Sequence, residues 1–199
     1  MCTVCRNQLP LTEYTFNAVN PVDRIFYGRI NIVKASSFLF FTEKGIVKSI
    51  IHYLKYKNQE QIGEFLGNWY GHILKQNKFL NNIDYVVPVP LHQKKLKKRG
   101  YNQVSLFAKS IAEHIGAQYL EGVLIKTANT RTQTKKSRIL RWQNKQALYV
   151  LTDHDIFRDK NVLLLDDVIT TGATMEACAT ALSATKGINI YVGSMAIVP

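Results

Sequence analysis

NVLLLDDVITTGAT, residues 161–174, is the most informative segment of this 199-residue chain. Its first half is an apolar run of strand length, which predicts a strand buried on both faces, as in a parallel sheet. Asp166 and Asp167 follow directly, and in an open α/β sheet ligands bind in the crevice outside the carboxyl ends of the strands. The segment therefore predicts an α/β protein with a binding site where this strand ends.

The five residues after the strand have the composition of a phosphate-binding loop: Thr170, Thr171, Gly172, Ala173 and Thr174. They supply hydroxyls, backbone N–H groups and a glycine that allows close approach, and residues 175–186 after them are predicted to form a helix. The Gly-Lys-Ser/Thr ending of a Walker loop is absent. An ordinary capped strand-turn-helix is the alternative. The paired acids favour a ligand site, because carboxylates accept hydrogen bonds from sugar hydroxyls and suit a ligand that also carries phosphate.

At these residues the chain resembles the type I phosphoribosyltransferases, which bind phosphoribosyl pyrophosphate (PRPP). The resemblance implies an open parallel sheet flanked by helices. It also implies that Asp166 and Asp167 are catalytic residues that hold the ribose hydroxyls, and that residues 170–174 hold the 5′-phosphate. PRPP or a nucleoside monophosphate is the expected ligand, with Mg²⁺ as cofactor.

Basic residues are concentrated in the middle of the chain. The net charge is +12, and residues 92–145 carry 13 basic and 2 acidic side chains. A solvated face is one explanation, but this surplus indicates an anionic partner, namely pyrophosphate, nucleic acid or both. No stretch reaches the roughly 18 apolar residues of a membrane span, and the N-terminus lacks the layout of a signal peptide. We expect a cytoplasmic protein with no membrane span.

The N-terminus contains half of a zinc site. Cys2 and Cys5 have the spacing of a ligand pair, whereas a structural zinc needs four ligands. Cys178 lies among small apolar residues of the helix after the phosphate loop, and we interpret it as a packing residue. The expected division is a partial zinc-module segment over residues 1–20 and a phosphoribosyltransferase-like domain over residues 21–199. We expect little or no zinc in the monomer.

The remaining pattern predicts the other elements in chain order. We expect strands around 24–28 and 37–41, helices from 45 to 54 and from 59 to 76, a strand at 83–89 that ends in prolines, a helix at 104–115, an apolar strand at 119–126, and strands at 147–151 and 188–198. Lys55, at the end of the first of these helices, is not explained by packing and is a candidate to point into the cleft.

Two further segments have the composition of anion-binding loops. The strand at 83–89 leads into a turn with four lysines and then RGYNQ, residues 99–103, whose arginine is the fifth cation before the next helix. A second anion site there would suit a ligand with phosphates at both ends, although a solvated basic turn is the alternative. Residues 127–144 are polar, basic and poor in apolar residues, and such a length inside a compact domain is typical of a functional or mobile loop. We interpret them as a flexible basic lid.

Together with the central segment, these elements resemble the ComF family of competence-associated, phosphoribosyltransferase-like proteins. The resemblance rests on VPVPLH at 87–92, RGYNQ at 99–103 and the Arg141-x-x-Asn144 element. It implies that Arg99, Gly100 and Tyr101 form the pyrophosphate loop. It also implies that the flexible loop includes Lys135, Lys136, Arg138 and Arg141. The family usually begins with a four-cysteine zinc module, of which this chain has two cysteines.

The expected function is transfer of phosphoribosyl to an acceptor that the sequence does not identify, in a protein linked to DNA uptake in competence. Mg²⁺ and the basic loops would neutralise the leaving pyrophosphate, and the two acids would orient a ring that gains positive charge. Two alternatives are a module that binds single-stranded DNA, with Tyr101 and Trp142 stacking on bases, and a PRPP-sensing regulator without turnover. Proteins of the competence machinery are the expected macromolecular partners.

Overall fold

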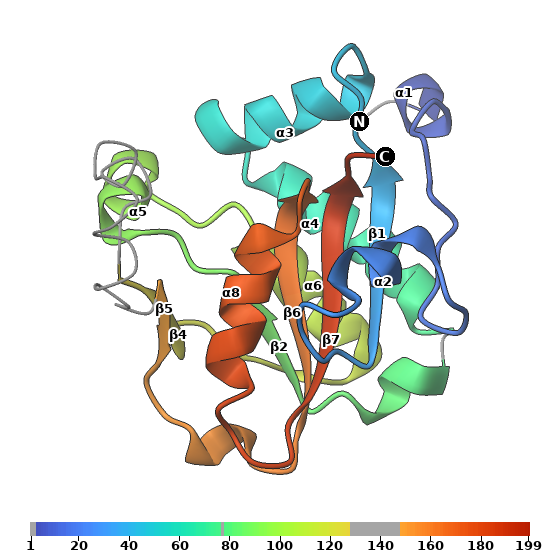
Figure 1. Ribbon diagram of the computed structural model, residues 1–199. Coiled ribbons are helices and arrows are strands. Elements are labelled where there is room, and N and C mark those ends of the chain that lie inside the picture. The colour runs from blue at the N-terminus through green and yellow to red at the C-terminus, as the bar shows by residue number, and fades with distance from the viewer. Residues whose placement is uncertain (1–2, 77, 128–147) are drawn as a thin grey trace.

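The computed structural model describes residues 3–76, 78–127 and 148–199 (Figure 1). Its centre is a five-stranded parallel sheet with the order β1-β7-β6-β2-β3. These strands are β1 (Lys34–Phe40), β2 (Tyr85–Pro88), β3 (Gln118–Tyr119), β6 (Asn161–Ile169) and β7 (Asn189–Ile197). A separate antiparallel ribbon pairs β4 (Leu124–Lys126) with β5 (Tyr149–Leu151). The open parallel sheet confirms the predicted fold class.

Helices cover both faces of the sheet (Figure 1). One face carries α2 (Pro21–Phe26) and α8 (Ala173–Leu182), and the other carries α4 (Gln61–Leu74) and α6 (Ser105–Ile115). Helix α3 (Ile46–Tyr56) lies at the end of the sheet where the strands finish. The short elements are α1 (Thr3–Asn7), η1 (Lys78–Asn82), α5 (Gln93–Arg99) and η3 (Asp155–Phe157).

Strand β6 lies in the middle of the sheet and is buried on both faces. Val162 and Leu164 pack into the apolar cluster on the α8 side, whereas Leu163 and Leu165 pack into the cluster on the α4 and α6 side. All four are fully buried, and they alternate because successive side chains of a strand point to opposite faces. This arrangement explains why the sequence shows a continuous apolar run rather than alternation.

The prediction of a strand at 24–28 was wrong, because the segment up to Phe26 belongs to helix α2. Asn20 and Asp23 form a reciprocal capping box, and Pro21 occupies the first helical turn. Both features favour a helix start and stabilise a helix of six residues. The local capping signal therefore outweighs the β-branched and aromatic composition.

Two other expected segments also differ. The basic turn after β2 is helix α5, capped by the His92 side chain and ended by Gly100 in the left-handed region at φ 86°. The single strand expected at 119–126 is divided between β3 and β4, which belong to different sheets. Gly122, at φ 84°, lies between them and allows the chain to leave the main sheet.

The N-terminal segment packs against the main sheet. Leu9 and Phe16 are buried in the core cluster on the α4 and α6 side. Cys5 lies in α1, whereas Cys2 is outside the described residues, so the expectation for zinc stays a prediction. Within the described parts of the chain, no group of three or more His, Cys, Asp or Glu side chains is placed to hold a metal ion. Cys178 is fully buried, as expected for a packing residue.

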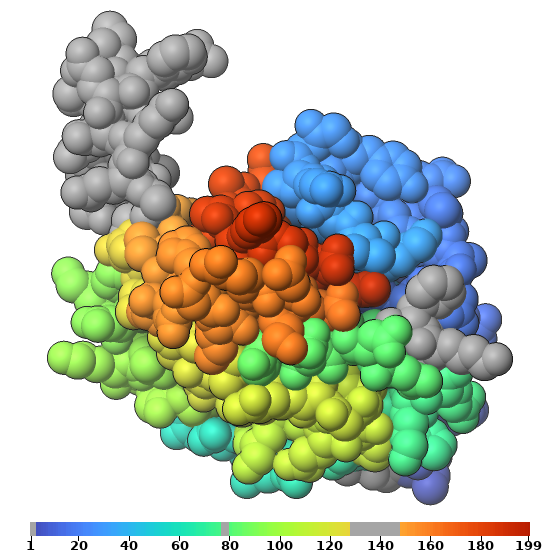
Figure 2. All heavy atoms as spheres, turned by 90° about the horizontal axis from the view of Figure 1, so that it is seen from below, coloured from blue at the N-terminus to red at the C-terminus, as the bar shows by residue number. Residues whose placement is uncertain are grey.

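The two ends of the sheet differ. Figure 2 shows the end at which the strands begin, where the red segment leading into β7 lies between the blue N-terminal part of the chain and the orange segment leading into β6. There Asp159 N–H donates to the carbonyl of Lys186, and Val33 N–H to that of Ile190. In open parallel sheets ligands bind at the opposite end, outside the carboxyl ends of the strands. Over the residues described, no helix has the length and apolarity needed to cross a membrane.

Candidate functional site

Asp166 and Asp167 lie near the carboxyl end of β6. The strand continues to Ile169, which is paired with Ile197 of β7, so the acids are inside the strand rather than just past it. Their exposed fractions are 8% and 5%. Burying two adjacent carboxylates is costly unless partners compensate for the lost water, and different elements of the chain supply partners to each acid.

Asp167 is held by two side chains from distant segments. Lys55 Nζ, at the end of α3, lies 2.8 Å from its Oδ1, and Gln103 Nε2, just before α6, donates to its Oδ2 at 2.5 Å. Arg99 in turn donates to Oε1 of Gln103. The structure thus confirms that Lys55 points towards the acids. Gln103 was missed as a site residue, although its place in the RGYNQ segment was a usable signal.

Asp166 has a different environment. Its Oδ1 accepts the backbone N–H of Asp167 at 2.8 Å. Burial, and then the charge of Asp167, raise the pKa of Asp166 to about 8, and the more distant charges of Lys55 and Lys126 offset this only in part. The acid pair therefore combines one carboxylate in an ion pair with one that favours its protonated form.

The β4–β5 ribbon adds two functional candidates that sequence reasoning missed. Lys126 Nζ donates to the Tyr149 hydroxyl at 2.8 Å and lies 4.9 Å from the centre of its ring. Burial, and then the charge of Lys95, lower the pKa of Lys126, and the charge of Asp166 opposes this shift. Lys126 is thus close enough to Lys95 of α5 and to Asp166 for both charges to affect its pKa. Nothing in its local sequence marks it, because its position depends on how the ribbon packs.

The predicted phosphate loop is next to the acids. Residues 170–174 lead from β6 into α8, with Gly172 in the left-handed region at φ 75°. The loop and Asp166 line a hollow of about 50 Å³. Ala173 N–H donates to Oγ1 of Thr171 at 3.4 Å. The structure therefore brings together the paired acids and a loop at a helix N-terminus, which is suited to an anion.

A larger cleft opens between α3 and α5. It has a volume of about 400 Å³ and is lined by Lys55, Tyr56, Asn58, Lys95, Lys98 and Arg99. Four of these side chains are cationic, so the cleft suits an anionic group. Because Lys55 also contacts Asp167, the cleft is connected to the acids through that side chain.

Gly100 and Tyr101, the other residues of the expected pyrophosphate loop, do not line this cleft. Gly100 ends α5, and Tyr101 packs partly buried against the core with its hydroxyl donating to the carbonyl of Leu54. The hydroxyl and part of the ring of Tyr101 are therefore engaged within the protein, and its stacking on a base stays a prediction. Lys135, Lys136, Arg138 and Arg141 of the expected lid lie outside the described residues, as does Trp142.

Comparison with known proteins supports the predicted phosphoribosyltransferase-like fold. A family model described as a phosphoribosyl transferase domain matches residues 104–192. Among solved structures, glutamine PRPP amidotransferase from B. subtilis, complexed with ADP and GMP, superposes with a TM-score of 0.51 at 22% identity, covering 73% of this chain and 30% of that one. At this identity the likeness concerns the fold alone.

Two curated relatives are closer in sequence. Competence protein F of Haemophilus influenzae is 29% identical over 130 residues, which is 63% of this chain and 57% of that protein. DNA utilization protein YhgH of Escherichia coli K12 is 28% identical over 136 residues, which is 67% of this chain and 59% of that protein. The match thus spans less than two thirds of the length of each relative.

The parallel sheet, its carboxyl-end acids and the matching domain model define a phosphoribosyltransferase-like protein. Within this class the two relatives and the motifs at residues 87–92 and 99–103 agree, and the chain is similar to proteins of the ComF family.

Proposed function

We propose that this protein binds PRPP, or a nucleoside monophosphate, at the carboxyl end of its sheet. Asp166 and Asp167 would accept hydrogen bonds from the ribose hydroxyls, and residues 170–174 would hold the 5′-phosphate. The observation that carries the proposal is that one hollow is lined both by the phosphate loop and by Asp166. Such a hollow suits a ligand in which a phosphate is attached to a sugar.

The cationic cleft would take the second anionic end of PRPP. Lys95, Lys98 and Arg99 line it, and Lys55 connects it to the acids. A pyrophosphate there would be held mainly by electrostatic attraction, which stabilises a leaving group as its negative charge develops. Nucleoside monophosphates lack this group and would leave the cleft free.

Mg²⁺ fits the donor set of this site. It binds through one or two carboxylates together with substrate phosphates, and Asp166 is a carboxylate that lines the same hollow as residues 170–174. A cation would also favour the ionised form of Asp166, whose burial opposes ionisation. Asp166 would hold the ion together with the phosphates of the ligand, and the ion would supply charge neutralisation for the pyrophosphate.

In the transferase form of the proposal, an acceptor displaces pyrophosphate at the anomeric carbon of the ribose. Lys55 and Gln103 fix the orientation of Asp167, so that its carboxylate stabilises the positive charge of the ring in the transition state. Pyrophosphate release from PRPP and Mg²⁺ with candidate acceptors measures turnover. Tight PRPP binding without release for any acceptor would instead support a PRPP-sensing role.

The double substitution Asp166→Ala and Asp167→Ala is expected to weaken PRPP affinity at least about 10-fold, or about 1.4 kcal/mol. It removes the acceptors for the ribose hydroxyls and leaves the phosphate loop in place. Titration calorimetry with PRPP and Mg²⁺ measures the effect. The matched control is Asp153→Ala with Asp155→Ala, which removes two exposed acids at the other end of the sheet. Equal affinity of the double variant and the wild type would refute the ribose assignment.

Binding of single-stranded DNA is a second candidate function, and the surface formed by α3 and α5 favours it. Helix α3 exposes Tyr53 and Tyr56, at 51% and 66%, beside the basic helix α5. The Arg99 guanidinium lies 5.5 Å from the centre of the Tyr56 ring. Aromatic rings beside a basic groove are the features with which proteins bind single strands without sequence preference. Tyr53 and Tyr56 are more exposed than the partly buried Tyr101 and are the stronger candidates for base stacking.

If this surface binds DNA, Tyr56→Ala should cost roughly 1–3 kcal/mol of affinity for a single strand. Replacing Lys94, Lys95, Lys97 and Lys98 with Ala should weaken binding to all sequences and flatten its salt dependence, since each phosphate contact contributes about −0.7 to the slope. Fluorescence anisotropy with a labelled oligonucleotide measures both effects. Tyr27→Ala is the control, because that tyrosine is exposed at 61% next to α2. An equal loss in both tyrosine variants, or no binding at physiological salt, would reject this function.

A further inference from the structure

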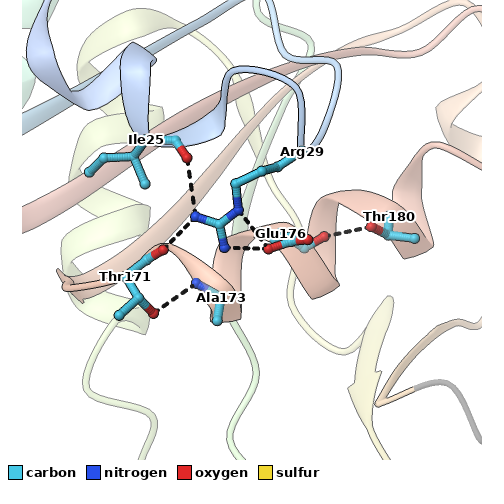
Figure 3. A network of polar contacts seen from close by, with 6 residues as sticks. All are labelled: Ile25, Arg29, Thr171, Ala173, Glu176 and Thr180. Atoms are coloured by element: carbon cyan, nitrogen blue, oxygen red, sulfur yellow. Dashed lines mark hydrogen bonds and ion pairs between the residues drawn. The ribbon is translucent and has the colours of Figure 1, made fainter. Parts of the chain in front are cut away.

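The phosphate loop is contacted from outside by Arg29, which follows α2 (Figure 3). Arg29 Nη1 donates to the carbonyl of Thr171 at 2.6 Å and to that of Ile25 at 3.1 Å. Its Nε donates to Oε2 of Glu176 at 3.0 Å, and its Nη2 forms an ion pair with the same oxygen. One guanidinium thus connects α2, the phosphate loop and the first turn of α8, from a position 142 residues before Thr171 in the chain.

The bond to Thr171 affects the direction of the loop's N–H groups. The peptide bond between Thr171 and Gly172 is trans, so its carbonyl and its N–H point in opposite directions. Because Arg29 holds the carbonyl, the N–H of Gly172 points away from Arg29. Arg29 is not among the residues that line the hollow beside Asp166. The contact therefore directs the Thr171 carbonyl oxygen, which would repel a phosphate, towards the Arg29 guanidinium. The N–H of Gly172 then faces the other side of the loop.

Helix α2 also supports the loop by direct packing. A Cβ added at Gly172 would lie 2.7 Å from Cγ2 of Ile25 and 2.9 Å from Cε1 of Phe26, so the loop backbone rests on these side chains. Helix α2 is itself tied to β1, because Asp23 Oδ1 accepts the N–H of Ala35 at 2.6 Å. The loop is thus held against the sheet by a route that does not pass through β6 or α8.

Arg29 also compensates a charge that would oppose an anionic ligand. Glu176 lies in the first turn of α8, where a carboxylate stabilises the partial positive charge of the helix N-terminus. A phosphate bound at the same terminus would be repelled by that carboxylate. The ion pair with Arg29 offsets the negative charge without removing it from the helix.

Resting on the proposed function, we infer that Arg29 is a positioning residue for the 5′-phosphate of a phosphoribosyl ligand. It acts through the Thr171 carbonyl and the Glu176 carboxylate and not by contact with the ligand. Two consequences follow. Loss of Arg29 weakens binding of the 5′-phosphate end, and it leaves binding at the cationic cleft between α3 and α5 unchanged.

The test compares two probes by titration calorimetry, AMP for the phosphate loop and inorganic pyrophosphate for the cationic cleft. Arg29→Ala is expected to lower AMP affinity about 10-fold and to leave pyrophosphate affinity unchanged. Arg29→Lys keeps the charge but not the planar fork, so it should recover only part of the AMP affinity. Arg158→Ala is the matched control, because Arg158 forms an exposed ion pair with Asp155 within three residues.

A second variant keeps the inference testable if Arg29→Ala does not fold. Glu176→Gln removes the carboxylate charge and is expected to maintain or raise AMP affinity, so a lower AMP affinity in this variant alone contradicts the proposed role of the ion pair. Where Arg29→Ala folds, the double variant should bind AMP better than Arg29→Ala alone. Equal AMP affinity in wild type and Arg29→Ala, or a parallel loss for both probes, overturns the role of Arg29 alone. Failure of the wild-type protein to bind AMP overturns the proposed function and this inference with it.

Discussion

Asp166→Asn is expected to raise the free energy of unfolding, by an amount that grows as the pH rises from about 4 to about 8. Burial raises the pKa of Asp166 from 3.8 to about 8 in the folded protein. Between these values the unfolded chain loses the proton and the folded protein keeps it, so wild-type stability falls with increasing pH, by at most about 1.4 kcal/mol per pH unit. Asn does not ionise, so the free energy of unfolding of the Asp166→Asn variant does not fall with pH for this reason.

Urea denaturation of wild type and Asp166→Asn at pH 5 and pH 8 measures the effect. The difference between the two proteins should be larger at pH 8, on the order of a few kcal/mol. Asp155→Asn, at an exposed position, is the control and should show little pH dependence. A difference of equal size at both pH values would show that Asp166 is ionised in the folded protein. Because Asp166 is proposed to bind ribose, the stabilised variant should bind PRPP more weakly, as expected when a site is maintained against stability.

Gly172→Ala is expected to destabilise the protein by about 1–3 kcal/mol and to lower AMP affinity by more than about 10-fold. Two costs combine at this position. The backbone is in the left-handed region at φ 75°, which disfavours any side chain with a Cβ. The new methyl group would also meet Ile25 at 2.7 Å and Phe26 at 2.9 Å, so the loop or α2 must move.

Gly116→Ala separates these two costs. Gly116, which ends α6, has nearly the same backbone conformation, at φ 74°, but a Cβ there would meet nothing within 4 Å. This variant should therefore carry the backbone cost without the clash, and it should keep its affinity for AMP. Thermal unfolding and titration calorimetry measure the two quantities. If Gly116→Ala and Gly172→Ala lose AMP affinity equally, the contact between α2 and the loop is not required for binding.

Local signals were enough to predict the main elements of the fold. The apolar run that became β6, and the helical periodicity of α3, α4 and α6, depend on neighbours within a few residues and were predicted correctly. Short elements were predicted less well. The six residues of α2 and the seven of α5 have little apolar periodicity, and their start and stop signals, the capping box at Asn20 and the left-handed Gly100, were not recognised.

The sequence alone determined the type of sheet, the strand that carries the paired acids, the loop that follows it and the family resemblance, because each of these is written in consecutive residues. Only the tertiary structure decided which side chains surround the acids and the loop. Lys55 reaches Asp167 across 112 positions, Gln103 across 64, and Arg29 reaches the loop across 142. Such contacts depend on how strands and helices pack in three dimensions. A short window can mark a candidate such as Lys55 or Gln103, but it does not identify the distant residue that the candidate contacts.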